Sequence, residues 1–242
     1  MQLLIVRHAD PDYSIDSLTP TGWEEAELLS GWLAKLPIDA FYVSPLGRAK
    51  DTASLTLKKF GKEATVCDWL QEFPPKIMRP DAGRLIIPWD WLPAEWTKEE
   101  RYFDHQNWYD TEIMNDGHVG DAYRKVVKGL DQLLAHHGYR RKDLYYQAEQ
   151  PNRDTIVLFC HFGVECVLLS HLLNISPMAL WHGFCAAPSS VTTLVTEERR
   201  EGAAYFRMNC FGSTAHLDAT GREPSVAARF CETFTCKEER HD

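Results

Sequence analysis

The chain has 242 residues, of which 44% are hydrophobic and 25% are charged, and its formal net charge is -9. This composition predicts a globular protein with a sizeable core, and the negative charge argues against a general binder of nucleic acid or of anionic membranes. The seven cysteines include no CxxC pair, which favours reduced thiols over a disulfide framework. The first residues lack the basic flank of a signal peptide, and no apolar run approaches the roughly 18 residues of a membrane span. We therefore expect a cytoplasmic protein.

The first 70 residues alternate predicted strands and helices. The LLIV run at 3–6 is unbroken and apolar, which is typical of a strand buried on both faces. A helix is expected after Thr19, whose side chain can cap it and which is followed by Pro20 at the first helical position. Thr21 and Glu24 offer an alternative capping box. Further along, the pattern predicts a strand at 39–45, a helix at 46–60 and a strand at 64–70. This alternation indicates βαβ units and a parallel sheet.

Residues 73–115 break the alternation and are interpreted as an insertion. They hold four of the eight tryptophans, several prolines and mixed charge. One interpretation is that the tryptophans pack the insertion onto the body, and the other is that the segment forms a lid over a site. The segment also brings cations that could meet a second anionic group of a ligand: Arg79, Arg84, Lys98 and Arg101.

The rest of the chain returns to regular elements. Residues 121–138 predict an amphipathic helix that ends near Gly138. Residues 154–161 are a second strongly apolar strand, and like the first it ends in a histidine, after which another helix begins at once. Residues 189–198 and 203–211 flank a polar turn and predict a hairpin.

Four basic side chains fall at one edge of the predicted sheet. His8 and His161 each follow a buried strand, Arg7 precedes His8, and Arg48 follows the second strand near the start of its helix. Ligands of parallel sheets gather outside the carboxyl ends of the strands, where helix amino termini add N–H groups and partial positive charge. The planar fork of arginine matches phosphoryl oxygens. The convergence predicts a phosphate site, although each residue alone has a structural explanation.

Four segments, in order, resemble the histidine phosphatase superfamily. LLIVRHA resembles the strand and RHG signature, and LTPTGWEEAELL resembles the LTxxGxxQA helix. VSPLGRAKDTA resembles the SxLxRAxxTA segment, and FCHFGVECVLL resembles the second-histidine segment, with APSSVTTLV as the strand after it. The resemblance implies a phosphoglycerate-mutase-like α/β fold, a three-layer sandwich with a mostly parallel central sheet and helices on both faces. The matched segments extend from residue 1 to about 196, and we expect a single domain over 1–242 with 73–115 as an inserted cap or lid.

The resemblance also implies a phosphohistidine mechanism. His8 would be the nucleophile, and Arg7, Arg48 and His161 would hold the phosphoryl oxygens. Water would then hydrolyse the phosphohistidine. No cofactor and no metal is implied, because the side chains supply the positive charge.

In one branch of the family the acid that protonates the leaving group lies in an LxE segment after the third strand. Leu70-Gln71-Glu72 fits that place, so Glu72 is the expected acid, and Glu165 is the weaker alternative. The other branch places the acid directly after the second histidine, where this chain has Phe162.

Some positions depart from the family pattern. Ala9 stands for the usual glycine, and Pro11 and Ser14 stand where the family has a hydroxyl and an asparagine shortly after the first histidine. Ser14 is kept as a candidate phosphate-binding residue. Asp10 and Asp12 add negative charge nearby, which either forms a turn or disfavours strongly anionic substrates. These departures leave the substrate open.

The leading interpretation is a phosphomonoesterase that acts on a small phosphorylated metabolite, a small-molecule phosphate ester. A phosphoglycerate-type mutase is the alternative, and a non-catalytic phosphoryl-binding or scaffold module is a further one. A zinc site of Cys231, Cys236 and His241 is a poor fit, because the spacing is not that of a usual ligand pair. We expect no nucleic-acid partner and no membrane partner, and the oligomeric state, a homo-oligomer included, stays open.

Overall fold

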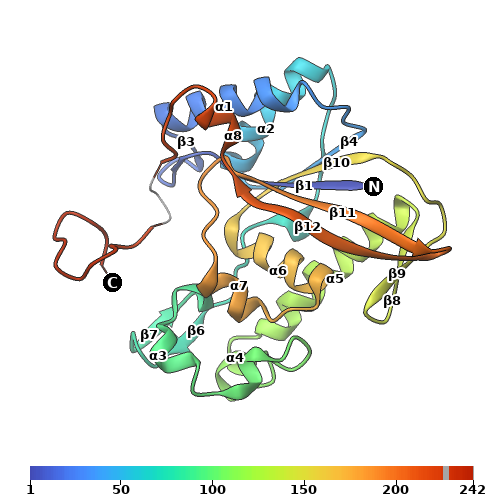
Figure 1. The fold of residues 1–242 in the computed structure, drawn as a ribbon. Coiled ribbons are helices and arrows are strands. Elements are labelled where there is room, and N and C mark those ends of the chain that lie inside the picture. The colour runs from blue at the N-terminus through green and yellow to red at the C-terminus, as the bar shows by residue number, and fades with distance from the viewer. Residues whose placement is uncertain (226–228, 242) are drawn as a thin grey trace.

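The computed structural model describes residues 1–225 and 229–241, which form an α/β fold around an eight-stranded sheet (Figure 1). The strand order is β5-β4-β10-β1-β11-β12-β9-β8. The bounds of these strands, in that order, are Thr65–Val66, Ala40–Val43, Thr155–Cys160, Gln2–Arg7, Val191–Arg200, Ala203–Ser213, Tyr145–Ala148 and Tyr139–Lys142. The three-layer α/β class expected from the sequence is confirmed.

The sheet has a parallel half and an antiparallel half. Strands β5, β4, β10 and β1 pair in parallel, with Leu4 opposite Val157 and Leu158 opposite Tyr42. On the other side of β1 the pairing is antiparallel, through β11 and β12 to the β9 and β8 edge. The predicted hairpin is β11 and β12. The β8–β9 hairpin has no counterpart among the elements predicted from the sequence.

Helices cover both faces of the sheet. Helices α1 (Pro20–Leu33), α2 (Gly47–Phe60) and α8 (Ala215–Asp218) lie on one face, and α5 (Val119–His136), α6 (Phe162–Leu173) and α7 (Pro177–Gly183) lie on the other (Figure 1). Successive residues of β1 face opposite cores, because side chains alternate along a strand. Leu4 and Val6 pack with the α1 and α2 side, and Leu3 and Ile5 pack with the α5 and α6 side.

The helix starts follow the sequence signals. Thr19 caps α1, where its hydroxyl accepts the N–H of Gly22 at 3.0 Å, and Pro20 occupies the first helical position. The cap at Thr19 is therefore confirmed, and the box that starts at Thr21 does not form the helix start. Helix α2 ends at Gly61 with a φ of 59°, a left-handed conformation that glycine adopts at low cost.

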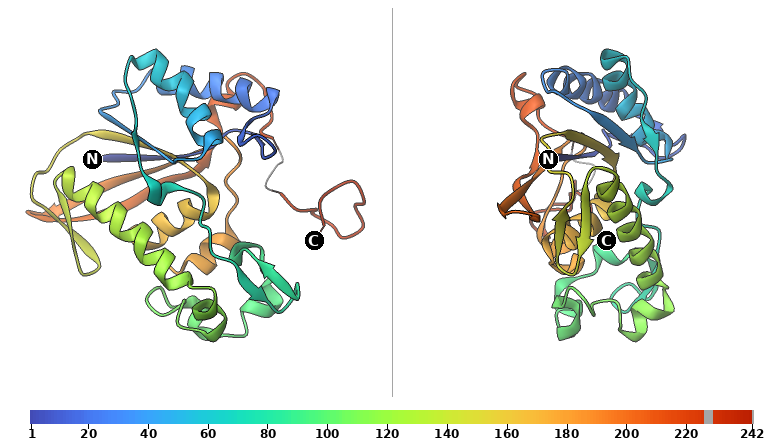
Figure 2. Two further views of the ribbon diagram at one scale, coloured as in Figure 1. Left: turned by 180° about the vertical axis from the view of Figure 1, so that it is seen from behind. Right: turned by 90° about the vertical axis from the view of Figure 1, so that its right-hand side faces the viewer.

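Residues 73–115 form short elements on the α5 and α7 side of the sheet, shown in green in Figure 2. They are the hairpin β6 (Ile77–Arg79) and β7 (Arg84–Ile86), helices α3 (Pro93–Trp96) and α4 (Glu112–Asp116), and 3-10 turns at Pro88–Asp90 and Glu100–Phe103. A 3-10 turn at Asp68–Leu70 leads into them from β5. The small hairpin β2 (Pro11–Asp12) and β3 (Ser17–Leu18) lies between β1 and α1.

The tryptophans of the insertion mostly pack inward. Trp91, Trp96 and Trp108 are buried, and the ring of Trp108 meets that of Trp181 on α7 edge to face, with centroids 5.4 Å apart. This observation agrees with the packing interpretation for these three residues. None of the helices in the described part of the chain combines the length and the apolar character needed to cross a membrane.

Candidate active site

The carboxyl ends of three neighbouring strands bring the predicted histidines together. Arg7 at the end of β1 lies opposite Cys160 of β10, and Phe159 lies opposite Val43 of β4. The N–H of His8 donates to the carbonyl of Cys160 at 2.9 Å. The residues that follow the three strands, His8, His161 and Ser44, therefore lie side by side at one edge of the sheet.

His8 is held in one tautomer at this edge. Its Nδ1 donates to its neighbour's carbonyl, that of Ala9, at 2.8 Å, so Nε2 keeps its lone pair. The N–H of Ala9 is bonded in turn to the hydroxyl of Thr52 on α2 at 2.9 Å. Burial, helped by the charge of Arg7, holds the pKa of His8 well below its usual value. The imidazole is therefore kept neutral near pH 7, with Nε2 unprotonated.

His161 lies next to His8, with ring centroids 5.1 Å apart. Its Nε2 shares a hydrogen bond of 2.7 Å with the hydroxyl of Ser44. Its Nδ1 is buried and has no hydrogen-bond partner among the residues that the structure describes. Burial, together with the charges of its neighbours, also lowers the pKa of His161 well below the usual value.

Arg7 and Arg48 flank the histidines, and each is anchored through one nitrogen. Nη1 of Arg7 donates to the carbonyl of Ala186 at 2.5 Å, and Nη1 of Arg48 donates to Asp16 at 2.5 Å. The Nε atoms of both guanidiniums are buried without a partner in the described parts of the chain. Arg7 also lies over the ring of Phe162, with its guanidinium carbon 5.9 Å from the ring centroid.

Three buried nitrogens thus lack partners at one place: Nε of Arg7, Nε of Arg48 and Nδ1 of His161. Buried polar groups almost always have hydrogen-bond partners, so each such group calls for an explanation. Donors of this kind around a neutral histidine fit a bound anion with several acceptor oxygens.

Glu72 reaches the same place from the loop after β5. One oxygen of its carboxyl group accepts the N–H groups of Phe73 at 2.8 Å and Val164 at 3.1 Å, and the other accepts that of Gly163 at 3.4 Å. Gly163 and Val164 belong to the first turn of α6, so the helix terminus orients the carboxyl group. Burial nevertheless raises the pKa of Glu72, against the lowering effect of these N–H groups and of Arg7. Glu72 also lines the cleft described below.

The alternative acid, Glu165, lies inside the protein. Its side chain is 1% exposed, and it is not among the residues that line the cleft. Burial raises the pKa of Glu165 to about 7, although the Thr192 hydroxyl and the Arg7 guanidinium lower it. Glu72 lines the cleft, whereas Glu165 does not.

Ser14 is not brought to the other candidates. It is exposed, its hydroxyl donates to Asp12 at 2.5 Å, and it is absent from the cleft lining. The structure thus offers no contact in support of the predicted phosphate-binding role. Within residues 1–225 and 229–241, Cys231, Cys236 and His241 form no metal-binding cluster.

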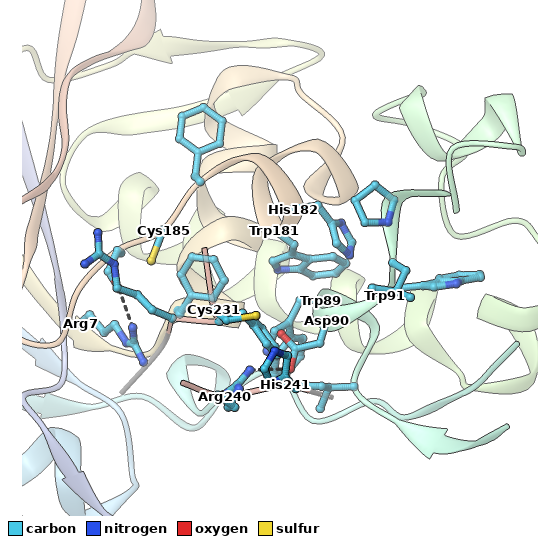
Figure 3. A pocket seen from close by; sticks show the side chains of 18 of the residues that line it. Arg7, Trp89, Asp90, Trp91, Trp181, His182, Cys185, Cys231, Arg240 and His241 are labelled. Atoms are coloured by element: carbon cyan, nitrogen blue, oxygen red, sulfur yellow. Dashed lines mark hydrogen bonds and ion pairs between the residues drawn. The ribbon is translucent and has the colours of Figure 1, made fainter. Parts of the chain in front are cut away.

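A cleft of about 940 Å³ opens above this arrangement. Arg7, Arg48 and Glu72 are among its lining residues, whereas His8 and His161 are buried, 1% and 0% exposed, and do not line it. Figure 3 shows Arg7 at one end of the cleft, Trp91 at the opposite end, and Trp181 between them. The insertion contributes lining residues at 87 and 89–93, and the C-terminal segment 229–241 contributes others, among them Phe230 and Arg240.

The cations of the insertion do not reach the cleft, contrary to the sequence-based expectation. Arg79 is buried and paired with Asp81, Lys98 is paired with Glu95, and Arg101 is paired with Glu99. Arg84 lies exposed on β7, and none of the four cations lines the cleft. The possibility that they meet a second anionic group finds no support in the cleft lining, and nearby carboxylates bind three of them.

Three supporting residues were not predicted from the sequence. Ser44 holds His161, Thr52 holds the backbone after His8, and Asp16 binds both Arg48 and the N–H of Gly47. Ser44 and Thr52 do carry a signal, because they are the serine and the threonine of the segment VSPLGRAKDTA. Asp16 carries none, since it approaches α2 from a separate hairpin.

Comparisons with known proteins agree with this geometry. The family model described as the histidine phosphatase superfamily (branch 1) matches residues 3–208. No curated protein sequence matches the chain.

Several solved structures share the fold. A mutant phosphoserine phosphatase from Entamoeba histolytica, in complex with phosphoserine, has 20% identity and a TM-score of 0.60, covering 89% of this chain and 98% of that one. A mycobacterial glucosyl-3-phosphoglycerate phosphatase has 18% identity and a TM-score of 0.57, covering 88% and 99%. The alpha-ribazole phosphatase from Shigella flexneri has 20% identity and a TM-score of 0.54, covering 86% and 95%. At these identities the likeness establishes the fold.

Proposed function

The chain belongs to the histidine phosphatase superfamily (branch 1), and we propose that it is a phosphomonoesterase that acts through a phosphohistidine on His8. Arg7, Arg48 and His161 bind the phosphoryl oxygens. The positive charge of the guanidiniums offsets the charge of the phosphoryl group in the transition state. A small phosphate ester is the substrate class, and the names of the phosphatases that share the fold support it.

The first step is in-line attack by Nε2 of His8 on phosphorus. The hydrogen bond from Nδ1 to Ala9 keeps the lone pair on Nε2 and orients the ring. In neutral His161, a hydrogen bond donated by Ser44 to Nε2 leaves the proton on Nδ1, which then donates to a phosphoryl oxygen. The P–O bond to the alcohol breaks as the P–N bond forms.

Glu72 is the proposed acid and base. Its raised pKa keeps the carboxyl group protonated to higher pH than an exposed glutamate, so that it can protonate the departing alkoxide. The resulting carboxylate then takes a proton from water. That water attacks the phosphohistidine, releases inorganic phosphate and restores neutral His8.

One observation carries this proposal: three buried, unpartnered nitrogen donors surround a histidine whose free ring nitrogen is unprotonated. A scaffold module would have no need of such an arrangement. Cytoplasmic location is part of the proposal and is supported by the seven cysteines, all of which are free thiols.

Phosphate release from 4-nitrophenyl phosphate tests the function. Wild-type protein should release nitrophenol, and His8→Ala should be inactive while keeping its circular dichroism spectrum. His136, an exposed histidine on α5, provides the matched control, and His136→Ala should retain full activity. Activity that survives in His8→Ala would contradict the proposal.

A further inference from the structure

We propose that the alcohol half of the substrate is apolar and carries a ring system, and that the cleft beyond the phosphate site binds it between aromatic side chains. This inference rests on the phosphomonoesterase function proposed above and adds the substrate class.

The cleft is much larger than the phosphoryl group needs. Pockets for drug-sized ligands measure about 300–1,000 Å³, and this cleft of about 940 Å³ lies near the upper end. The phosphate-binding donors occupy only one end of it, and Trp91 marks the other (Figure 3). The remaining length is therefore available to the leaving group.

The far part of the cleft is mainly apolar and aromatic. Trp89, Trp91 and Leu92 come from the insertion, and Trp181 and Phe184 come from α7 and its end. The rings of Trp89 and Trp181 lie next to each other, with centroids 6.0 Å apart. Tryptophans provide large, rigid walls with few rotamers to fix on binding, so they suit a planar apolar ligand.

Several large apolar side chains are left exposed at this cleft, among them Leu92 and Phe184. Leu92 is 47% exposed and Phe184 is 42% exposed, and both line it. Exposed apolar side chains that gather at one concave site mark a binding surface, whereas isolated ones need no explanation. An apolar ligand would cover them and release the water that they contact.

The charges of the cleft do not favour a second anionic group on the substrate. The four cations of the insertion lie outside the lining, as described above. Arg240 lies 3.6 Å from the carboxylate of Asp90 and stacks on Phe230. His182 is kept neutral, because burial lowers its pKa. Arg229 also lines the cleft, and phosphoserine in the experiment below reports on it.

The test compares four esters of primary alcohols, all of which release a basic alkoxide: 2-(2-naphthyl)ethyl phosphate, ethyl phosphate, phosphoserine and phosphocholine. Burial of roughly 60 Å² of apolar surface already gives about a tenfold gain. We therefore expect kcat/KM for the naphthylethyl ester to exceed that for each other ester by at least tenfold.

A matched pair of variants locates the effect. Leu92→Asp places a charge in the distal cleft and should lower the naphthylethyl-to-ethyl ratio of kcat/KM by at least tenfold. Leu85 is also an exposed leucine of the insertion, 62% exposed on β7 and outside the lining, so Leu85→Asp should leave the ratio unchanged. Phe184→Ser repeats the comparison at the end of α7, with Phe103→Ser, at an exposed residue outside the lining, as its control.

The outcomes separate the two proposals. Preference for phosphoserine or phosphocholine, or equal ratios in Leu92→Asp and Leu85→Asp, would overturn the apolar substrate class while the phosphomonoesterase function stands. Failure to hydrolyse any of the four esters would overturn the function, and the inference with it.

Discussion

Replacing Glu72 by Gln tests the acid through the basicity of the leaving group. The amide carbonyl can still accept the N–H groups of Phe73 and Val164, now 2.8 and 3.1 Å from the carboxyl oxygen. The amide nitrogen would replace the oxygen that accepts from Gly163 at 3.4 Å, a long and therefore weak bond. The variant should keep its fold and lose only the proton.

The magnitude depends on the alcohol that leaves. General acid catalysis contributes about 10²–10⁴-fold, or roughly 3–5 kcal/mol of barrier. An alkyl phosphate such as ethyl phosphate releases a basic alkoxide, so Glu72→Gln should lose that full factor in kcat/KM. Nitrophenolate is already stable as an anion, so 4-nitrophenyl phosphate should lose less than about tenfold in kcat/KM.

Burst kinetics and pH profiles extend the same test. If Glu72 also activates water, Glu72→Gln should release one equivalent of nitrophenol rapidly and then turn over slowly. The pKa of Glu72 is raised above 4.5, and activity on ethyl phosphate should fall as pH rises through that raised value, because the acid loses its proton. This alkaline limb should be absent in the variant. Equal losses on both esters, with no burst, would refute the assignment.

Three further changes probe the groups around the phosphoryl site. Arg48→Ala removes a charge-assisted donor worth roughly 1.5–3 kcal/mol, so kcat/KM for 4-nitrophenyl phosphate should fall at least tenfold. As a control, Lys50→Ala on the exposed face of α2 should leave kcat/KM unchanged. Unchanged activity in Arg48→Ala would place Arg48 outside the site. Ser44→Ala should lower kcat with only a small change in melting temperature, because the tautomer of His161 is no longer fixed by the hydroxyl. A kcat equal to that of wild type would contradict this role. Glu165 keeps its proton up to a pKa of about 7 in the folded protein against 4.5 unfolded, so the stability it contributes is complete below 4.5 and is lost as pH rises through 7. The loss is on the order of 3 kcal/mol, and urea titrations at pH 5 and pH 8 should show a smaller decrease for Glu165→Gln than for wild type; parallel decreases would show that Glu165 is not protonated in the fold.

The sheet edge that carries the site was predictable because its signals are local. Unbroken apolar runs predicted β1 and β10, and the residue after each strand is a histidine. Parallel pairing then places such residues together, whatever their distance in the sequence. The cap at Thr19 was predictable for the same reason, since a hydroxyl directly before proline acts over a single turn.

The charges of the insertion show where local pattern falls short. Arg79, Lys98 and Arg101 were considered as partners of a second anionic group because they belong to the segment that follows the expected acid, Glu72. Each binds a carboxylate two or three residues away in the chain. Those carboxylates are visible in the sequence, but the sign of a charge alone does not determine the direction in which a side chain points. Conversely, Asp16 meets Arg48 across 32 residues, and only the packed hairpin brings them together.

Phosphoryl transfer to His8 is the central claim, and rapid-quench labelling tests it most directly. The protein is mixed with a substrate that carries a ³²P phosphoryl group, quenched in alkali within milliseconds and digested. The account predicts label that is stable in alkali, labile in acid and located in the peptide that contains His8, and none in His8→Ala. Label on a serine, on an aspartate or on His161 would contradict the account.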